Sequence, residues 1–124
     1  MSYELLDRGS FLQIRFFGVL ESKDFANLFS EFLKYEEESA IVPNRISTLS
    51  DMDDFIIQFS KMLPIAEHRK QKRFIPQIKS AIVASRPIEM AIAGMLKCLN
   101  MNTSIIIQVF STFAEAEKWV GEHP

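Results

Sequence analysis

The alternation of apolar and polar side chains predicts strands at several places along the chain. Residues 3–8 and 10–17 are predicted to be two strands with a turn between them at Gly9, and the second shows the period of two that is typical of a strand with one buried face. The predicted strands 79–85 and 104–110 contain uninterrupted apolar runs at 81–84 and 105–107. Such runs are typical of parallel strands that helices cover on both faces.

Helical spacing of apolar residues follows the first pair of strands. Ser22 suits a helix N-cap, and Asp24 lies in the first turn, where an acid is favourable. One face of this helix is apolar, and we expect it to lie in the core: Phe25, Leu28, Phe29, Phe32 and Leu33. The three glutamates at 36–38 are expected to be solvated in a frayed helix end, because acids are unfavourable at a helix C-terminus.

The central stretch, residues 44–73, is predicted to be a strand, an acidic turn and a long helix. The strand, 44–49, is less apolar than an interior strand usually is. The turn comprises Ser50, Asp51, Met52, Asp53 and Asp54. The helix is predicted to have one apolar face made of Phe55, Ile56, Phe59, Met62 and Leu63. Pro64 lacks the amide donor and clashes with the preceding turn, so we expect a kink there or a break before a second segment at 65–73.

Two further helices complete the pattern. Pro87 and Glu89 mark the start of one, and Thr112 with Glu115 forms a capping box at the start of the last. The predicted order is β-β-α-β-α-β-α-β-α, without an internal repeat. This order implies an α/β fold in a single domain, residues 1–124, with a mixed, mostly parallel sheet of about five strands and packed helices.

The composition is that of an ordinary globular protein, with 48% hydrophobic and 24% charged residues. The net charge of −2 argues against a nucleic-acid binder. No apolar run approaches the roughly 20 residues of a membrane helix, and the first residues do not resemble a signal peptide. We therefore expect a cytoplasmic protein without integral membrane association.

Two further features of the composition have simple interpretations. The one cysteine, Cys98, cannot form an internal disulfide, and its place between Leu96 and Leu99 predicts a small buried residue. Four basic side chains form one run, which we interpret as a solvated helix end: Arg69, Lys70, Lys72 and Arg73.

Candidate chemical groups gather at the ends of the predicted strands. Each strand-to-helix junction carries a hydroxyl, and N-capping explains all of them: Ser22, Ser50, Ser85, Ser111 and Thr112. Ser85 with Arg86, at a helix N-terminus, is the best candidate for a small-anion site. Asp51, Asp53 and Asp54 are candidate metal ligands or an acid/base pair, but they lack the glycine and closing glutamate of a calcium loop. We prefer to interpret them as capping and solvated acids.

The sequence contains no motif that specifies a reaction. A glycine-rich phosphate loop, an HExxH segment and a nucleophile elbow are all missing from it. We therefore expect no catalytic residue, no bound metal and no cofactor, in a protein that is not an enzyme.

Together with the order of elements, three segments resemble the SpoIIAA-like, or STAS, superfamily. They are residues 48–53, the apolar strand that ends at Ala84 and Ser85, and a C-terminal pattern of Val109, Phe110, Phe113, Glu115, Ala116, Trp119 and Val120. More narrowly, the chain resembles the small stand-alone bacterial proteins of that superfamily, whose function is mostly unassigned. The resemblance implies a mixed, mostly parallel sheet with helices packed on it.

The chain departs from the anti-sigma-factor antagonists of that superfamily at their phosphorylation site. In those proteins a strand ending in an acid and a hydroxyl residue leads to a phosphorylatable serine at the start of the next helix. Laid on this chain, the acid position is Thr48, the hydroxyl position is Ser50 and the phosphoacceptor position is Ile57. Phosphorylation needs a hydroxyl, so the resemblance does not extend to the phosphoserine switch.

The resemblance leaves two functions open. The first is a regulatory or protein-interaction module that binds a protein partner, or itself as a homodimer, through Ser50, Asp51, Asp53, Asp54, Phe55 and the adjoining helix. The second follows from the similarity of the superfamily's fold to lipid-carrying CRAL-TRIO domains. It implies a carrier or sensor of a small lipophilic or anionic ligand near Ser85 and Arg86, with phenylalanine-rich helices as walls. The eleven phenylalanines and six methionines suit such a pocket and an ordinary core equally well.

Overall fold

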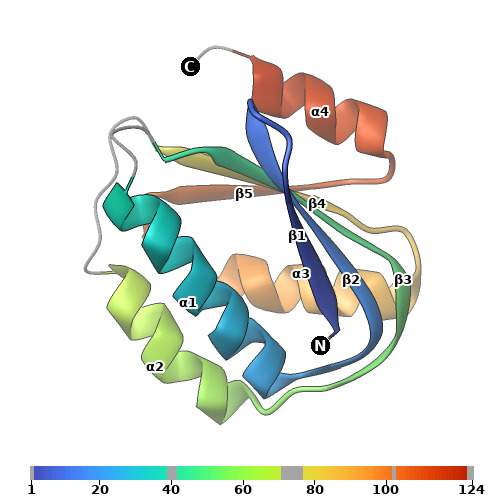
Figure 1. The fold of residues 1–124 in the computed structure, drawn as a ribbon. Helices are drawn as coiled ribbons and strands as arrows, with labels where there is room; N and C mark the ends of the chain where they lie inside the picture. The colour runs from blue at the N-terminus through green and yellow to red at the C-terminus, as the bar shows by residue number, and fades with distance from the viewer. Residues whose placement is uncertain (1, 39–41, 71–76, 102, 123–124) are drawn as a thin grey trace.

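A computed structural model describes residues 2–38, 42–70, 77–101 and 103–122. In these residues the elements follow the predicted order (Figure 1). The strands are β1 (Tyr3–Asp7), β2 (Phe11–Glu21), β3 (Asn44–Ile56), β4 (Ile78–Val83) and β5 (Ile105–Phe110). The helices are α1 (Ser22–Glu38), α2 (Phe59–Lys70), α3 (Pro87–Leu99) and α4 (Phe113–Gly121).

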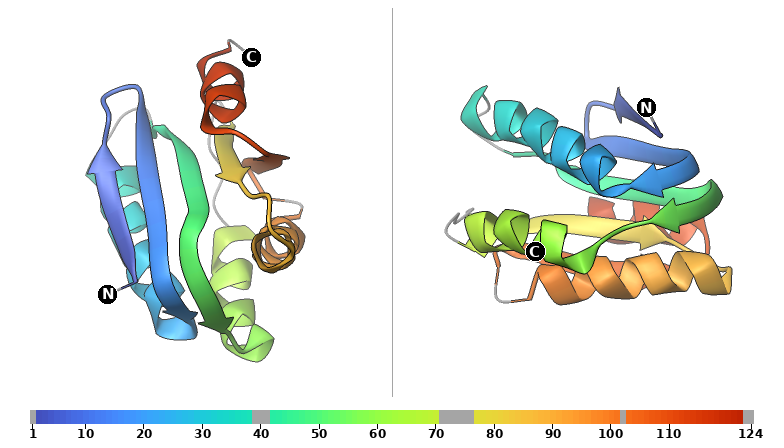
Figure 2. Two further views of the ribbon diagram at one scale, coloured as in Figure 1. Left: turned by 90° about the vertical axis from the view of Figure 1, so that its right-hand side faces the viewer. Right: turned by 90° about the horizontal axis from the view of Figure 1, so that it is seen from below.

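The five strands form one sheet in the order β1-β2-β3-β4-β5 (Figure 2). β1 is antiparallel to β2, and every other neighbouring pair is parallel. Gly9 makes the turn between β1 and β2 with a φ of 87°, a conformation that glycine adopts without a steric penalty. The predicted α/β fold with a mixed, mostly parallel sheet is confirmed.

Helices cover the two faces of the sheet unequally. α1, α2 and α3 lie on one face, and α4 lies on the other (Figure 1). The main core, under the first three helices, includes Phe16, Phe25, Leu28, Met62 and Ile92. The smaller core under α4 consists of Phe11, Ile46, Ala81, Ala116 and Val120. Burial of each large apolar side chain contributes about 1.5–3 kcal/mol, so the face with three helices holds most of the stability.

The prediction for residues 50–56 was wrong. The acidic segment is not a turn, and Phe55 and Ile56 are not helical, because β3 continues through all of these residues. At two places in the pairing of β2 with β3, one extra residue of β3 lies opposite β2. These two irregularities interrupt the alternation of side chains along β3 and explain the error. The core-facing side chains of this half of β3 are therefore three residues apart, at Leu49, Met52 and Phe55. A spacing of three imitates a helix in a sequence.

α2 begins later than predicted, at Phe59, and it contains Pro64 without a break. Proline deprives the carbonyl of the residue four positions earlier, Ser60, of its partner. Both Pro64 and Ser60 are exposed, so water can replace the missing donor. The predicted break is therefore wrong, whereas the alternative of a kink stays a prediction. Residues 71–73 and the side chains of Arg69 and Lys70 lie outside the described residues, so the basic run stays a prediction.

Two smaller predictions were also wrong. α1 does not fray at its glutamates but includes all three, and the side chain of Glu36 is only 3% exposed, whereas Glu37 and Glu38 are exposed as expected. Cys98 is exposed, because α3 turns Ile92, Ala93 and Leu99 toward the sheet instead.

Candidate functional site

The predicted site residues of the central stretch lie along the second half of β3. Ser50, Asp51, Asp53 and Asp54 are exposed, whereas Phe55 is half-buried and packs against the main core. Asp54 accepts a hydrogen bond from the amide of Phe55 at 2.8 Å. The five predicted residues therefore do not form one site. The four polar side chains face solvent, and Phe55 packs against the main core.

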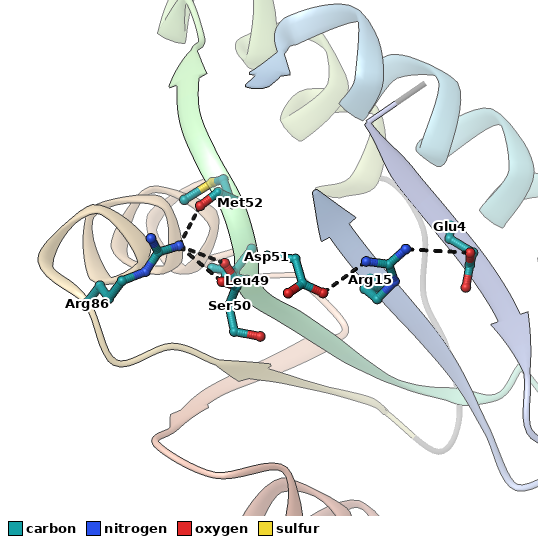
Figure 3. Close-up of polar contacts among 7 residues, drawn as sticks. All are labelled: Glu4, Arg15, Leu49, Ser50, Asp51, Met52 and Arg86. Atoms are coloured by element: carbon teal, nitrogen blue, oxygen red, sulfur yellow. Dashed lines mark hydrogen bonds and ion pairs between the residues drawn. The ribbon is translucent and has the colours of Figure 1, made fainter. Parts of the chain in front are cut away.

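Asp51 is the end of a row of charges that crosses three strands (Figure 3). Its carboxylate accepts a hydrogen bond from Arg15 on β2 at 2.9 Å, and Arg15 lies 3.8 Å from Glu4 on β1. The guanidinium of Arg15 also lies over the ring of Phe17, 4.8 Å from its centre. These side chains are substantially exposed, so each ion pair contributes at most about 1 kcal/mol.

The predicted anion site at Ser85 and Arg86 is occupied by a side chain of the protein itself. The amide of Ser85 donates to a carboxylate oxygen of Glu89 at 3.2 Å, and Nε of Arg86 donates to the other oxygen. Glu89 is buried, with a side chain only 2% exposed. The amide and the guanidinium that were expected to bind an external anion therefore bind a carboxylate three to four residues further along α3.

Arg86 has a second structural role at the edge of β3. The pairing of β3 with β4 ends at Thr48, so the following carbonyls on this edge have no partner strand. Nη2 of Arg86 donates to the carbonyl oxygens of Leu49 (3.4 Å), Ser50 (3.3 Å) and Met52 (Figure 3). The guanidinium thus links α3 to the irregular half of β3, and it brings Ser50 close to Arg86, two residues that are far apart in the sequence.

The junction hydroxyls do not all cap helices as predicted. Thr112 does so, accepting a hydrogen bond from the amide of Glu115 at 3.2 Å. Ser50 lies within β3, and the N-cap of α3 is Arg86, without a side-chain hydrogen bond. Ser22 accepts from the amide of Gln58 at 3.0 Å and so joins the start of α1 to the segment before α2.

A cavity lies between α1, the sheet and the end of α3, and its lining does not include Ser85 or Arg86, near which a pocket was expected. Its volume is about 50 Å³. The apolar side chains around it are Phe16, Phe25, Leu28, Phe29, Phe32, Ile82, Leu96, Ile105 and Ile107. A smaller hollow of about 10 Å³ lies next to it, and Phe29, Leu96 and Asn100 line both. These three side chains are therefore the wall between the two spaces.

Polar side chains form part of the cavity's lining where the sheet faces the helices. They are Arg45 and Ser47 on β3 and Ser80 on β4. Arg45 binds Glu36 of α1 at 3.0 Å, with side chains 4% and 3% exposed, and lies over the ring of Phe32 at 3.8 Å. The ion pair offsets much of the large desolvation cost of both charges. The low apolar content of residues 44–49 was the one sequence signal of this lining.

The described residues contain neither a metal-binding cluster nor a membrane-spanning helix. No group of three or more histidine, cysteine, aspartate or glutamate side chains is arranged to hold a metal ion there. None of the helices in this part of the chain is long and apolar enough to span a membrane.

Comparison with known proteins identifies the fold. No protein-family model matches the sequence, and no curated protein is significantly similar to it. The structure is similar to the crystal structure of an uncharacterised DUF3478-family protein with a SpoIIAA-like fold from Shewanella loihica PV-4. The TM-score is 0.60 at 11% sequence identity, over 95% of this chain and 91% of the other. The chain therefore has the SpoIIAA-like fold that its sequence pattern resembles.

Proposed function

We propose that this protein is a non-enzymatic binding module that carries or senses a small, mainly apolar molecule. The ligand lies in the cavity between α1 and the sheet, with its polar group on Ser47 and Ser80. The observation that supports this proposal is the polar lining of an otherwise apolar cavity. Side chains on a helix-covered sheet face are normally apolar, because buried polar groups destabilise the fold unless they are hydrogen-bonded.

The lining matches what small-molecule sites usually have. Such sites are mostly apolar and aromatic, with a few polar groups that orient the ligand. Here Phe25, Phe29 and Phe32 provide aromatic walls, whereas Ser47 and Ser80 provide hydroxyls. Arg45 is already neutralised by Glu36, so a neutral polar group suits this site better than a free anion. We therefore propose a ligand with a neutral polar group at Ser47 and Ser80 in place of the anionic ligand expected near Ser85 and Arg86.

The size of the cavity determines how a ligand enters. A volume of about 50 Å³ holds only a few atoms, whereas sites for larger ligands span roughly 300–1,000 Å³. Rotation of Phe29 would join the cavity to the smaller hollow under α2 and α3. We therefore propose that α1 moves away from the sheet when the ligand binds, with Phe29 as the gate.

A titration with straight-chain alcohols of four to twelve carbons tests the proposal, and the corresponding carboxylic acids, which are anions near neutral pH, should stabilise the protein less. Ser47→Leu fills the cavity, and Thr48→Leu is the matched control, because the next residue of β3 points to the opposite face of the sheet. We expect a concentration-dependent rise in melting temperature for the wild type and Thr48→Leu, and none for Ser47→Leu. A ligand at 100 times its dissociation constant stabilises a protein by about 2.7 kcal/mol. Equal stabilisation of all three proteins, or of none, would refute the proposal.

A second candidate function is the binding of a protein partner at the end of β2 and β3. The observation that favours it is a pair of exposed apolar side chains, Val19 (44% exposed) and Ile56 (66%), beside the exposed acids Asp53 and Asp54. Such a surface suits a partner with apolar and basic groups. Ile56→Ser together with Asp53→Asn should abolish capture of that partner in a pull-down from the native cells. Unchanged capture of every protein would exclude this surface.

A further inference from the structure

The two outer strands of the sheet, β1 and β5, differ in how their free edges are protected. β1 carries Glu4 and Asp7, and Arg8 follows directly. Charges at an edge discourage pairing with another chain. β5 has the sequence IIIQVF, and the chain has no charged residue between Lys97 and Glu115. The free edge of β5 is thus left without the protection that β1 has.

The backbone of β5 presents hydrogen-bonding groups in an alternating pattern. The carbonyls of Ser104 and Phe110 accept hydrogen bonds from Ile78 and Ala84, on the β4 side. Successive residues of a strand point their backbone groups to opposite sides, so Ile107 and Val109 direct their N–H and C=O groups outward. Among the described residues, β5 pairs only with β4. These two residues therefore present four backbone groups along an open edge.

The same edge has exposed apolar side chains beside those groups. Ile106 is 38% exposed, and Phe110 is half-buried. Both point to the face that α4 covers, because they lie an even number of residues apart and Phe110 packs against the α4 core. An uncharged strand with apolar side chains on one face is self-complementary, since pairing with its own copy places no like charges together.

We propose that two copies of this protein associate through their β5 strands, antiparallel about a two-fold axis at Gln108. In this register Ile107 of each copy pairs with Val109 of the other, and each pair exchanges two N–H···O bonds. Ile106 then lies opposite Phe110 of the second copy, which covers the exposed isoleucine. The two sheets become one continuous sheet, and the isologous contact closes at a dimer.

Adding a charge at the axis tests this dimer. Gln108 is exposed, and its side chain faces that of the second Gln108 across a non-hydrogen-bonded pair, at about 5 Å between Cβ atoms. Gln108→Lys should weaken association by about tenfold or more, because two lysines then lie side by side. Gln58→Lys, at an exposed glutamine before α2, adds the same charge elsewhere and should leave the dimer unchanged. Analytical ultracentrifugation over a range of concentrations measures both.

Amide hydrogen exchange of the wild type gives an independent test. Ile107 and Val109 amides should exchange slowly at concentrations where the dimer forms and rapidly where it dissociates, whereas Gln108 should be protected in both states by β4. A monomer at every concentration, a dimer with fast exchange at Ile107 and Val109, or open-ended oligomers would each overturn the proposal. So would a dimer that Gln108→Lys and Gln58→Lys affect equally.

Discussion

Replacement of Arg86 by alanine separates a structural role from an anion-binding one. The substitution removes the donors to the carbonyls of Leu49, Ser50 and Met52 and the partner of Glu89. Glu89 is 2% exposed, so its carboxylate would keep only the amide of Ser85. An uncompensated buried charge costs about 3–5 kcal/mol. Arg86 itself is 46% exposed, and water can enter the space it leaves, so we expect the lower end, about 3 kcal/mol.

Urea unfolding followed by circular dichroism measures this loss. The midpoint should fall with an unchanged slope, and the melting temperature should fall by about 10 °C for a chain of this size. Arg86→Ala combined with Glu89→Gln should lose about 1–2 kcal/mol less than the sum of the single substitutions, because no buried charge is left unpaired. Arg8→Ala, which removes an exposed arginine bound to Gln13, is the control and should change stability by less than about 0.5 kcal/mol.

Two results would refute this reasoning. The first is an Arg86→Ala protein as stable as Arg8→Ala, and the second is strict additivity of the Arg86 and Glu89 substitutions. If Arg86 instead bound an external anion, phosphate would stabilise the wild type and not Arg86→Ala. We expect phosphate to have the same small effect on both.

Three further predictions follow from single side chains. Met52→Ala should destabilise the fold by about 2–5 kcal/mol in urea unfolding, because Met52 is 1% exposed and belongs to the main core. If residues 50–54 were an exposed turn instead, the same substitution would be nearly neutral. Burial and the carboxylate of Glu31 raise the pKa of Tyr3 above its ordinary value of 10.0. Only the unfolded chain then loses this proton near pH 10, so stability should fall as the pH rises above 10, and Tyr3→Phe should remove that part of the fall. Thr112→Ala should cost about 1 kcal/mol through loss of the α4 cap, and Ser111→Ala, which leaves the cap intact, should cost less in the same assay.

The sequence predicted the order of elements because most of them have a regular period. Phe25, Leu28 and Phe32 recur at helical spacing and are buried on α1, and the apolar run of β4 lies within the sheet. The expected burial of β5 on both sides was wrong, because β5 is an edge strand in which only Ile105 is buried. β3 could not be predicted in the same way. Its two irregularities depend on how β2 pairs with it, and Leu49, Met52 and Phe55 acquire a helix-like spacing as a result.

The candidate site was predicted only in part for a similar reason. The expectation that Ser85 and Arg86 donate hydrogen bonds at a helix start agrees with the structure, but the acceptor is Glu89. The sequence contained a sign of this pair, because Arg86 and Glu89 are three residues apart and so lie on one face of a helix. The cavity depends on contacts between distant segments. Arg45 and Glu36 are nine residues apart on different elements, and only the packing of α1 on β3 buries them together.

Native mass spectrometry tests the proposed ligand site most directly. The wild type and Ser47→Leu are each mixed with the alcohol and acid series, and spectra are recorded under native and then denaturing conditions. We predict a mass excess of one ligand in the native spectrum of the wild type, lost on denaturation, and a bare mass for Ser47→Leu. A bare wild-type mass with every member of the series, or an equal excess in Ser47→Leu, would contradict the account.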